Sequence, residues 1–271
     1  LRMGGLGYNS DAQKNLNVCY NSLENYVETL SQAIKQPHPA YASIPAGQHG
    51  DYQQLNDSLL QIENEYYSSV RPKRVAMSGE RPTAALRRGG IEYVEVRSLD
   101  INVFDPCGIN QNTMRFMEAM LIYCMLADSP KLGVTELDEL ARNQIETAKH
   151  GRDPDFRLRR DGKPVTVPDW GSELIEGIAA VASVLDRQDG SDSYVAAVTQ
   201  MQELVADPDA TPSARIIAEL RDKKYFDSIA EPNDAVEAEY HEEAIDSLKR
   251  QAEIEAQDSM SLDDYLANYF R

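Results

Sequence analysis

The chain has 271 residues, of which 42% are hydrophobic and 27% are charged, values typical of a globular protein with a substantial core. Its 27 lysines and arginines against 45 aspartates and glutamates give a net charge of −18, which opposes binding to nucleic acid or to an anionic membrane surface. No apolar run approaches the roughly 20 residues that a membrane-spanning helix needs. The three cysteines lack metal-ligand spacing, as expected of free thiols in a reducing cytoplasm.

The first third of the chain predicts helices and one short strand. Apolar residues recur at steps of three and four over residues 11–35, and prolines follow at once, so a helix is expected there. Residues 59–67 alternate apolar and polar side chains, which predicts a strand and leaves a helix as the alternative. A basic Arg-Pro-Lys-Arg loop at 71–74 follows, and then a short helix at 83–88 that two glycines end.

The strand predicted after the two glycines is the most informative segment. Alternate residues of a strand share a face, so Tyr93, Glu95 and Arg97 are expected to project together, while Val94 and Val96 point into packing. A carboxylate beside a guanidinium suits a metal ion with a nucleotide phosphate, because Mg²⁺ prefers carboxylate oxygen and arginine grips phosphate in a fork. An ordinary solvated strand face, with the tyrosine shielding the sheet, is the alternative.

After residue 106 the sequence predicts a helical layer. The expected helices span residues 111–128, 135–149, 172–188, 192–206 and 212–222. Thr135 and Thr211 are predicted as N-caps, and residues 151–170 as irregular and partly basic. The first of these helices is expected to bury Met114, Met117, Leu121, Cys124 and Met125. An acidic helical tail over residues 227–264 has either a solvated face or a docking surface.

The pattern predicts an α+β fold in two parts, residues 1–105 with helices and strands and residues 106–271 with helices. All the features that suggest chemistry fall in the first part. The visible strands are too few for a complete sheet, and the chain starts with a leucine rather than an initiator methionine. We therefore expect this sequence to be part of a longer protein.

Several motifs together carry a resemblance to a known family. They are Gln61-Ile62-Glu63-Asn64-Glu65, Arg71-Pro72-Lys73-Arg74, Ser78-Gly79-Glu80 and the run from Arg88 to Asp100, with Leu1-Arg2-Met3 and Leu6-Gly7-Tyr8 upstream. The chain closely resembles proteobacterial glutamate–cysteine ligase, also called γ-glutamylcysteine synthetase. The similarity covers essentially the whole chain and is strongest up to about residue 128.

This resemblance implies a glutamine-synthetase-like ligase whose curved antiparallel sheet forms a funnel over Mg²⁺ (or Mn²⁺) ions, with helices outside. It implies that ATP phosphorylates the γ-carboxylate of glutamate and that the amine of cysteine attacks the γ-glutamyl phosphate. The products would be γ-glutamylcysteine, ADP and phosphate, in the first step of glutathione biosynthesis. The enzyme is expected to be cytoplasmic, to be monomeric at full length, and to act on small molecules without nucleic-acid or membrane partners.

The resemblance also assigns roles to individual residues. It implies that Glu95 is a metal ligand, that Arg97 is catalytic and contacts the ATP phosphates, and that Arg2, Tyr8 and Tyr67 bind substrate. Most of the family's metal ligands lie in the N-terminal half. We therefore expect this chain alone to be inactive and poorly folded, since half of its sheet and most of its ligands would be missing.

Two other functions remain open at this point. A related ligase could join glutamate to a different amine, with the same phosphate chemistry. An acidic helical interaction module without catalysis would explain the residues after 130, but not a paired Glu95 and Arg97 beside two glycines. A nucleic-acid role founded on the basic residues at 71–74 is disfavoured by the net charge.

Overall fold

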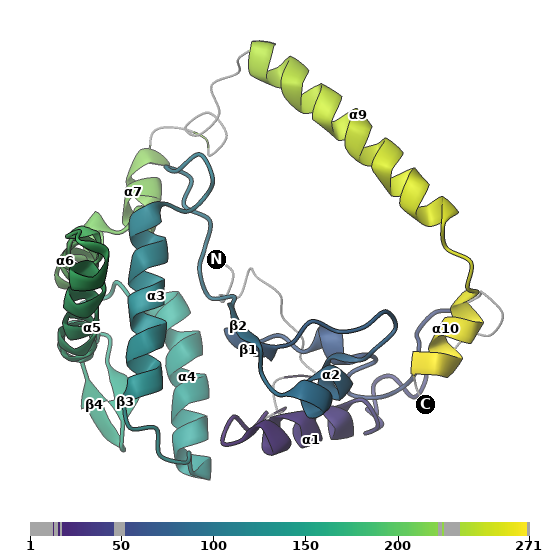
Figure 1. Cartoon of the computed structure of the whole chain (residues 1–271). Coiled ribbons are helices and arrows are strands. Elements are labelled where there is room, and N and C mark those ends of the chain that lie inside the picture. The colour runs from purple at the N-terminus through teal and green to yellow at the C-terminus, as the bar shows by residue number, and fades with distance from the viewer. Residues whose placement is uncertain are drawn as a thin grey trace. The chain divides into compact units, whose positions relative to one another are not determined.

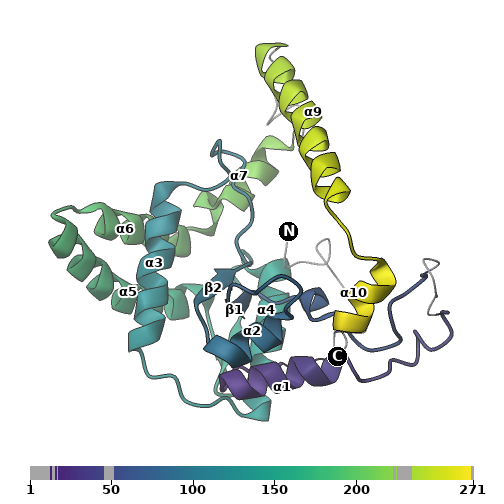
Figure 2. The same ribbon diagram turned by 45° about the vertical axis from the view of Figure 1, so that its right-hand side comes forward.

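The computed structural model describes residues 13, 16, 18–45, 52–221, 224 and 234–269 (Figures 1 and 2). They fall into two compact units. The first unit contains the described residues up to 98 together with 234–269, and the second contains those from 99 to 224. Each unit combines helices with a two-stranded antiparallel sheet, so the predicted α+β class is confirmed. No helix in these ranges has the length and apolar composition needed to cross a bilayer.

The core of the first unit is built around helix α1 (Leu23–Ala33). Ser22 has extended backbone, and its hydroxyl accepts a hydrogen bond from the Asn25 N–H at 3.1 Å, which starts the helix. The predicted start at residue 11 is therefore wrong, because residues 18–22 are not helical. The buried side chains that form this core are Val18, Tyr26, Val27, Leu30, Ala33, Ile34, Leu60, Tyr66 and Leu86.

The strand predicted at residues 59–67 is absent, and a 3-10 turn, η2 (Glu63–Glu65), lies there instead. The Glu63 side chain turns inward and is fully buried. Its carboxylate accepts hydrogen bonds from the N–H and the hydroxyl of Thr83, at 2.8 and 2.6 Å. Thr83 lies in the first turn of α2 (Pro82–Gly89), whose own N-cap residue makes no side-chain bond. Glu63 thus caps this helix from a distant segment, and its carboxylate interacts favourably with the positive end of the helix dipole.

The predicted acidic tail consists of two helices, α9 (Asp234–Ala256) and α10 (Leu262–Tyr269). Most of the described side chains of α9 are exposed. The end of α10 belongs to the core of the first unit, because Tyr269 is buried and its hydroxyl accepts a hydrogen bond from the Glu63 N–H at 3.2 Å. The guanidinium of Arg81 lies 5.8 Å from the centre of the same tyrosine ring.

The sheet of the first unit joins β1 (Val70–Lys73) to β2 (Tyr93–Val96) in antiparallel fashion. The prediction of a loop at residues 71–74 is therefore wrong, since three of these four residues form a strand. Pro72 contributes no backbone N–H, which a strand tolerates when it pairs on one side only, as β1 does among the described strands.

Of the two glycines predicted to end the short helix, Gly89 is the last residue of α2 and Gly90 is its C-cap. Gly90 has φ +74°, in the left-handed region that favours glycine. At Gly89 a Cβ would lie 2.2 Å from Nε of Arg74, so a larger residue there would displace the Arg74 guanidinium. The Arg74 guanidinium also donates to the carbonyl of Gly90 at 3.2 Å. The residue that follows β1 therefore holds the turn that leads into β2.

In the second unit, α3 (Gln111–Leu126), α5 (Val167–Asp189) and α6 (Ser193–Ala206) pack against one another, as Figure 1 shows. Gly177 permits close approach of two of these helices, since a Cβ there would lie 2.3 Å from the ring of Tyr123. The buried core residues of this unit are Ala119, Ile175, Ile178, Ala182 and Val198.

The buried face of α3 differs from the predicted one. Met114 and Cys124 are exposed, and Met125 is 84% exposed. The side chains that pack into the core are instead Phe116, Ala119, Met120 and Tyr123. This helix is apolar around most of its circumference, so the spacing of its apolar residues does not define which face is buried.

The sequence analysis missed a hairpin in the stretch 151–170. Strands β3 (Leu158–Arg160) and β4 (Lys163–Val165) pair across a two-residue turn, Asp161-Gly162, whose φ angles are +53° and +75°. Asp-Gly is a preferred sequence for such a turn, because both central residues need positive φ. The signal was therefore present, but the strands it joins are only three residues long.

Of the two predicted threonine N-caps, one is wrong and one is confirmed. Helix α4 (Val134–His150) has a glycine N-cap without a side-chain bond, so the assignment of Thr135 as cap is wrong. Helix α7 (Pro212–Glu219) follows the 3-10 turn η3 (Pro208–Ala210). Its cap is Thr211, as predicted, and the hydroxyl accepts a bond from the N–H of the third residue along.

Asp186, near the end of α5, caps the start of α6. Its carboxylate accepts hydrogen bonds from the N–H groups of Tyr194 and Val195, at 2.9 and 2.8 Å, and from the hydroxyl of Ser191 at 2.9 Å. Burial alone would raise the pKa of Asp186, but these donors outweigh it and lower the pKa below the ordinary 3.8.

We expect Glu63→Ala to lower the free energy of unfolding by about 2 kcal/mol, because it leaves the buried N–H and hydroxyl of Thr83 without an acceptor. Urea denaturation of the longest natural polypeptide that contains this chain, followed by circular dichroism, measures this change. Asn64→Ala, at the exposed neighbouring position, is the matched control and should have little effect. Equal stability of the two variants would show that the carboxylate does not support α2.

We expect Asp186→Asn to lower the thermal midpoint by several degrees at pH 7, with Asp189→Asn, an exposed aspartate on the same helix, as control. A lowered folded-state pKa stabilises above the unfolded-state value, and that stabilisation is lost as the pH falls through the folded-state pKa. The midpoints of the parent and the Asp186 variant should therefore converge below about pH 4. A difference that persists unchanged in acid would contradict the assignment.

Candidate functional site

One face of the β1–β2 sheet carries the charged side chains that the sequence marked as a site. The strand register places Arg71 opposite Glu95, with Lys73 two residues further along β1. Directly opposed residues of an antiparallel pair project to the same side. Arg97 follows β2, and its N–H donates to the carbonyl of Ser69 at 2.7 Å, so the backbone pairing continues past the strand end. Residues from both strands therefore contribute to one charged face.

Glu95 pairs with two cations through a single carboxylate oxygen. Nε of Arg97 lies 3.2 Å from Oε2 of Glu95, and Nζ of Lys73 lies 3.6 Å from the same oxygen. The predicted placement of Glu95 and Arg97 on one strand face is seen in this contact. The side chains of Lys73, Glu95 and Arg97 are 29%, 35% and 20% exposed, so each is partly accessible to a ligand, although Oε2 of Glu95 and Nε of Arg97 are themselves shielded.

The cations control the charge state of this carboxyl group. Partial burial by itself would raise the pKa of Glu95, but the Arg97 guanidinium, and after it the Lys73 ammonium, reverse this effect and hold the pKa below its ordinary value. Glu95 is therefore an anion at neutral pH, as a metal ligand must be.

Tyr67 lies beside the same group. The guanidinium carbon of Arg97 is 5.8 Å from the centre of the Tyr67 ring, within the range of a cation–π contact. The structure thus brings together Tyr67, Glu95 and Arg97, three of the predicted site residues. The other two, Arg2 and Tyr8, lie outside the described residues.

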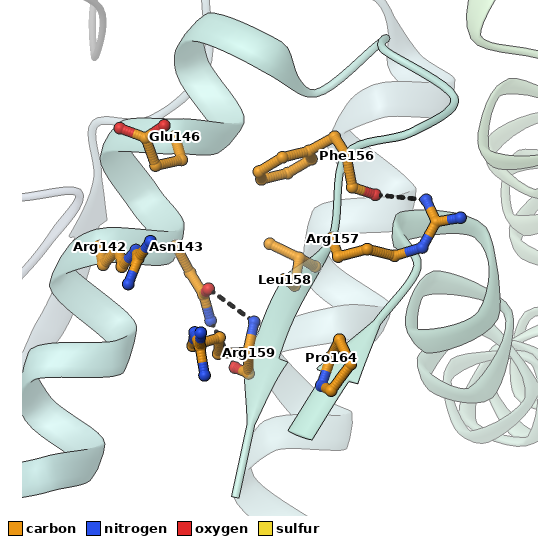
Figure 3. Close-up of a pocket in the computed structure, with 8 residues that line it drawn as sticks. All are labelled: Arg142, Asn143, Glu146, Phe156, Arg157, Leu158, Arg159 and Pro164. Carbon is orange, nitrogen blue, oxygen red and sulfur yellow. Dashed lines mark hydrogen bonds between the residues drawn. The ribbon is translucent and has the colours of Figure 1, made fainter. Parts of the chain in front are cut away.

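A pocket of about 300 Å³ in the second unit contains none of the predicted site residues (Figure 3). The hairpin and α4 line it, and Asn143 of α4 bonds the backbone of Arg159 in both directions, at 2.7 and 2.9 Å. The guanidinium of Arg157 points away from the pocket and donates to two backbone carbonyls (Figure 3). The Asn143 amide therefore holds the hairpin against the helix. The residues that line the pocket are Arg142, Asn143, Glu146, Phe156, Arg157, Leu158, Arg159 and Pro164.

Comparison with known proteins identifies the family, which the geometry of the site alone does not. The family model for glutamate–cysteine ligase matches residues 1–147, more than half of the chain. The chain belongs to the glutamate–cysteine ligase family. The predicted resemblance is thereby confirmed.

Individual relatives agree with this assignment. The glutamate–cysteine ligases of Pseudomonas paraeruginosa and Azotobacter vinelandii are 43% and 42% identical to it over 284 residues, which cover 99% of this chain and 54% of theirs. A crystal structure of the Francisella tularensis glutamate–cysteine ligase in complex with AMP matches with a TM-score of 0.82 and 36% identity, covering 100% of this chain and 56% of that one. The chain spans about half the length of the curated relatives it matches.

A bifunctional glutathione synthetase from Pasteurella multocida matches with a TM-score of 0.52 over 81% of this chain and 24% of its own. At 18% identity this match shows a shared fold and nothing further.

Glu95 fits a divalent cation as one member of a ligand set. Within the described ranges, no three histidine, cysteine, aspartate or glutamate side chains are grouped so as to hold a metal ion. Mg²⁺ is commonly held by one or two carboxylates, with phosphate and water oxygens completing its shell. Oε2 of Glu95 is shielded from solvent and, despite its two ion pairs, receives no well-aligned hydrogen bond. Its charge is balanced by these two ion pairs, so a cation bound at this oxygen would compete with Arg97 and Lys73.

Two basic residues that the sequence analysis placed in a loop have other roles. Arg71 is 3% exposed and donates to the carbonyl of Glu63 at 3.4 Å, so it belongs to the core and not to a solvated loop. Lys73 lies at the charged face. The alternation of basic residues around Pro72 was a weak strand signal, which the proline obscured. The pairing of Lys73 with Glu95 depends on the register of two strands twenty residues apart, which no local pattern reveals.

Proposed function

We propose that the polypeptide containing this chain is an ATP-dependent ligase that joins the γ-carboxylate of glutamate to the amino group of cysteine. Membership of the glutamate–cysteine ligase family supports this proposal, as does the AMP in the Francisella tularensis structure. The observation that carries it here is the contact of Glu95 with Arg97 on an accessible strand face. A carboxylate and a guanidinium in contact are the groups that a metal-bound nucleotide phosphate requires.

In the proposed reaction the glutamate γ-carboxylate attacks the terminal phosphorus of ATP, which gives γ-glutamyl phosphate and ADP. The amine of cysteine then displaces phosphate, which gives γ-glutamylcysteine, the first intermediate of glutathione biosynthesis. Phosphoryl transfer depends mainly on positioning and on neutralising charge. Arg97 is suited to this task, because Glu95 and the Tyr67 ring both restrict its guanidinium before any ligand arrives.

The remaining assignments follow the family pattern. Glu95 is proposed to hold Mg²⁺ or Mn²⁺, which when bound neutralises part of the charge on the phosphates. Arg2 and Tyr8 are proposed to bind substrate, and the Tyr67 hydroxyl to contact cysteine, since a phenol can donate to a carboxylate.

We also infer that the enzyme is cytoplasmic, monomeric and without nucleic-acid partners. The described cysteines, Cys19, Cys107 and Cys124, are all free thiols, as suits a reducing compartment. The net charge of −18 opposes contact with a polyanion, whereas a small phosphate ligand needs only a local cationic site.

Glu95→Gln tests the proposed metal ligand. We expect phosphate release that requires glutamate, cysteine and Mg²⁺-ATP, and we expect this substitution to reduce it at least about a hundredfold. The assay uses the longest natural polypeptide that contains this chain, with Glu176→Gln, an exposed glutamate of α5, as control. Unchanged release in the Glu95 variant would remove this residue from the site. Release with other amines but not with cysteine would point to a related ligase, and no release would defeat the proposal.

Two substitutions of Tyr67 separate its hydroxyl from its ring. We expect Tyr67→Phe to raise the KM for cysteine about tenfold and to leave the KM for ATP unchanged, because the ring beside Arg97 is kept. Tyr67→Leu removes the ring as well and should raise both KM values. If Tyr67→Phe has the same cysteine KM as the parent protein, the hydroxyl does not contact this substrate.

A further inference from the structure

Lys73 is a second cation at the Glu95 carboxylate. Lys73 and Arg97 both approach Oε2 of Glu95, so two positive charges face one negative charge. Lys73, Glu95 and Arg97 carry a net charge of +1 in a chain whose net charge is −18. Arg71, opposite Glu95 in the register, is a further cation, but it is buried and donates to the carbonyl of Glu63. A single guanidinium would already neutralise this carboxylate. The second cation leaves a local excess of positive charge at an accessible face, which is the property of a site for an anion.

The two cations differ in how firmly they are held. Arg97 has a second contact, with the Tyr67 ring, and is the less exposed of the pair. The ion pair that Lys73 makes in the described part of the chain is with Glu95, at the longer distance of 3.6 Å. A lysine ammonium is a point charge on a flexible four-carbon stem, so it can turn to a new partner at little cost. Lys73 is therefore the mobile member of the group.

A divalent cation and the Lys73 ammonium would compete for the same position beside the Glu95 carboxylate. Both are attracted to the Glu95 carboxylate, and they repel each other when both are close to it. A lysine displaced from the carboxylate still needs an anionic partner in a partly shielded position. The phosphate oxygens of a nucleotide that arrives with the cation provide one, since lysine is a common phosphate ligand.

We propose that Lys73 is an exchangeable counter-ion of Glu95 that, when a metal–nucleotide complex binds, leaves the carboxylate and binds a phosphate oxygen of the nucleotide. This proposal rests on the proposed function, because it assumes that Glu95 and Arg97 form the nucleotide site. It adds a second phosphate-binding cation, on β1, to the one that follows β2. It also couples metal binding to nucleotide binding, because each removes an obstacle to the other.

Binding measurements on the longest natural polypeptide that contains this chain test the exchange. Mn²⁺ binding is followed by electron paramagnetic resonance without and with ADP, and Mn²⁺-ADP binding by calorimetry. We expect Lys73→Met to weaken Mn²⁺-ADP binding about 10- to 100-fold, the size expected for a lost charge-assisted hydrogen bond. Mn²⁺ without nucleotide should bind as tightly as before or more tightly, because the competing ammonium is gone. The factor by which ADP strengthens Mn²⁺ binding should therefore fall.

Matched variants separate this role from a structural one. Lys73→Arg keeps the charge and should retain most of the Mn²⁺-ADP affinity, and Lys163→Met, on the exposed β4, should behave as the parent protein. Thermal unfolding of each variant shows whether the fold is retained. If Lys73→Met is unstable, Lys73→Gln, which keeps a polar side chain without the charge, takes its place.

The outcomes distinguish the two proposals. An Mn²⁺-ADP affinity within twofold of the parent in Lys73→Met would overturn the exchange. Loss of Mn²⁺ binding without nucleotide, to the same extent as with ADP, would also overturn it, since Lys73 would then only support Glu95. Arg97→Met is the reference: if it weakens ADP binding and Lys73→Met does not, the exchange alone fails. If neither substitution weakens ADP binding, the proposed nucleotide site fails as well.

Discussion

The buried carboxylate of Glu63 joins the segments on which the candidate site depends. It caps α2, while the backbone of the same residue contacts Arg71 of β1 and Tyr269 of α10. Because the chain passes from α2 through a short turn at Gly90 into β2, the anchoring of α2 also restricts the position of Glu95 on that strand. A fully buried carboxylate is costly unless donors surround it. Here the donors belong to a helix N-terminus and a hydroxyl, so the desolvated charge stabilises the arrangement that positions the site.

The acidic composition of the chain and its proposed anionic ligands are compatible because the relevant field is local. Cations at the sheet face outnumber the carboxylate they contact, and they are partly shielded from water, so screening there is weaker than at an open surface. Most of the described residues of α9 are exposed, and its acidic side chains contribute to the overall negative charge. The net charge therefore limits which classes of partner can bind the chain, while the strand register determines the local charge at the β1–β2 face.

Three errors in the sequence-based prediction share one physical origin. The alternation at residues 59–67 resembled a strand, but Glu63 faces inward because Thr83, twenty residues later, supplies its hydrogen bonds. Arg71 and Lys73 resembled a solvated loop, yet pairing with β2 makes them part of a sheet. On α3 the apolar residues are too numerous to mark one face, and contact with α5 selects it. In each case a partner distant in the chain decided the outcome.

By itself the sequence determined the helices of the second unit, the Thr211 cap, the glycine turn, the sharing of one strand face by Glu95 and Arg97, and the family. These features depend on periodicity, on capping chemistry and on short motifs, all of which act over a few residues. Only the tertiary structure decided that Lys73 joins Glu95 and that Tyr67 lies beside Arg97. Such contacts depend on strand register and on packing between distant segments, which follow from the energy of the whole fold and not from any local pattern.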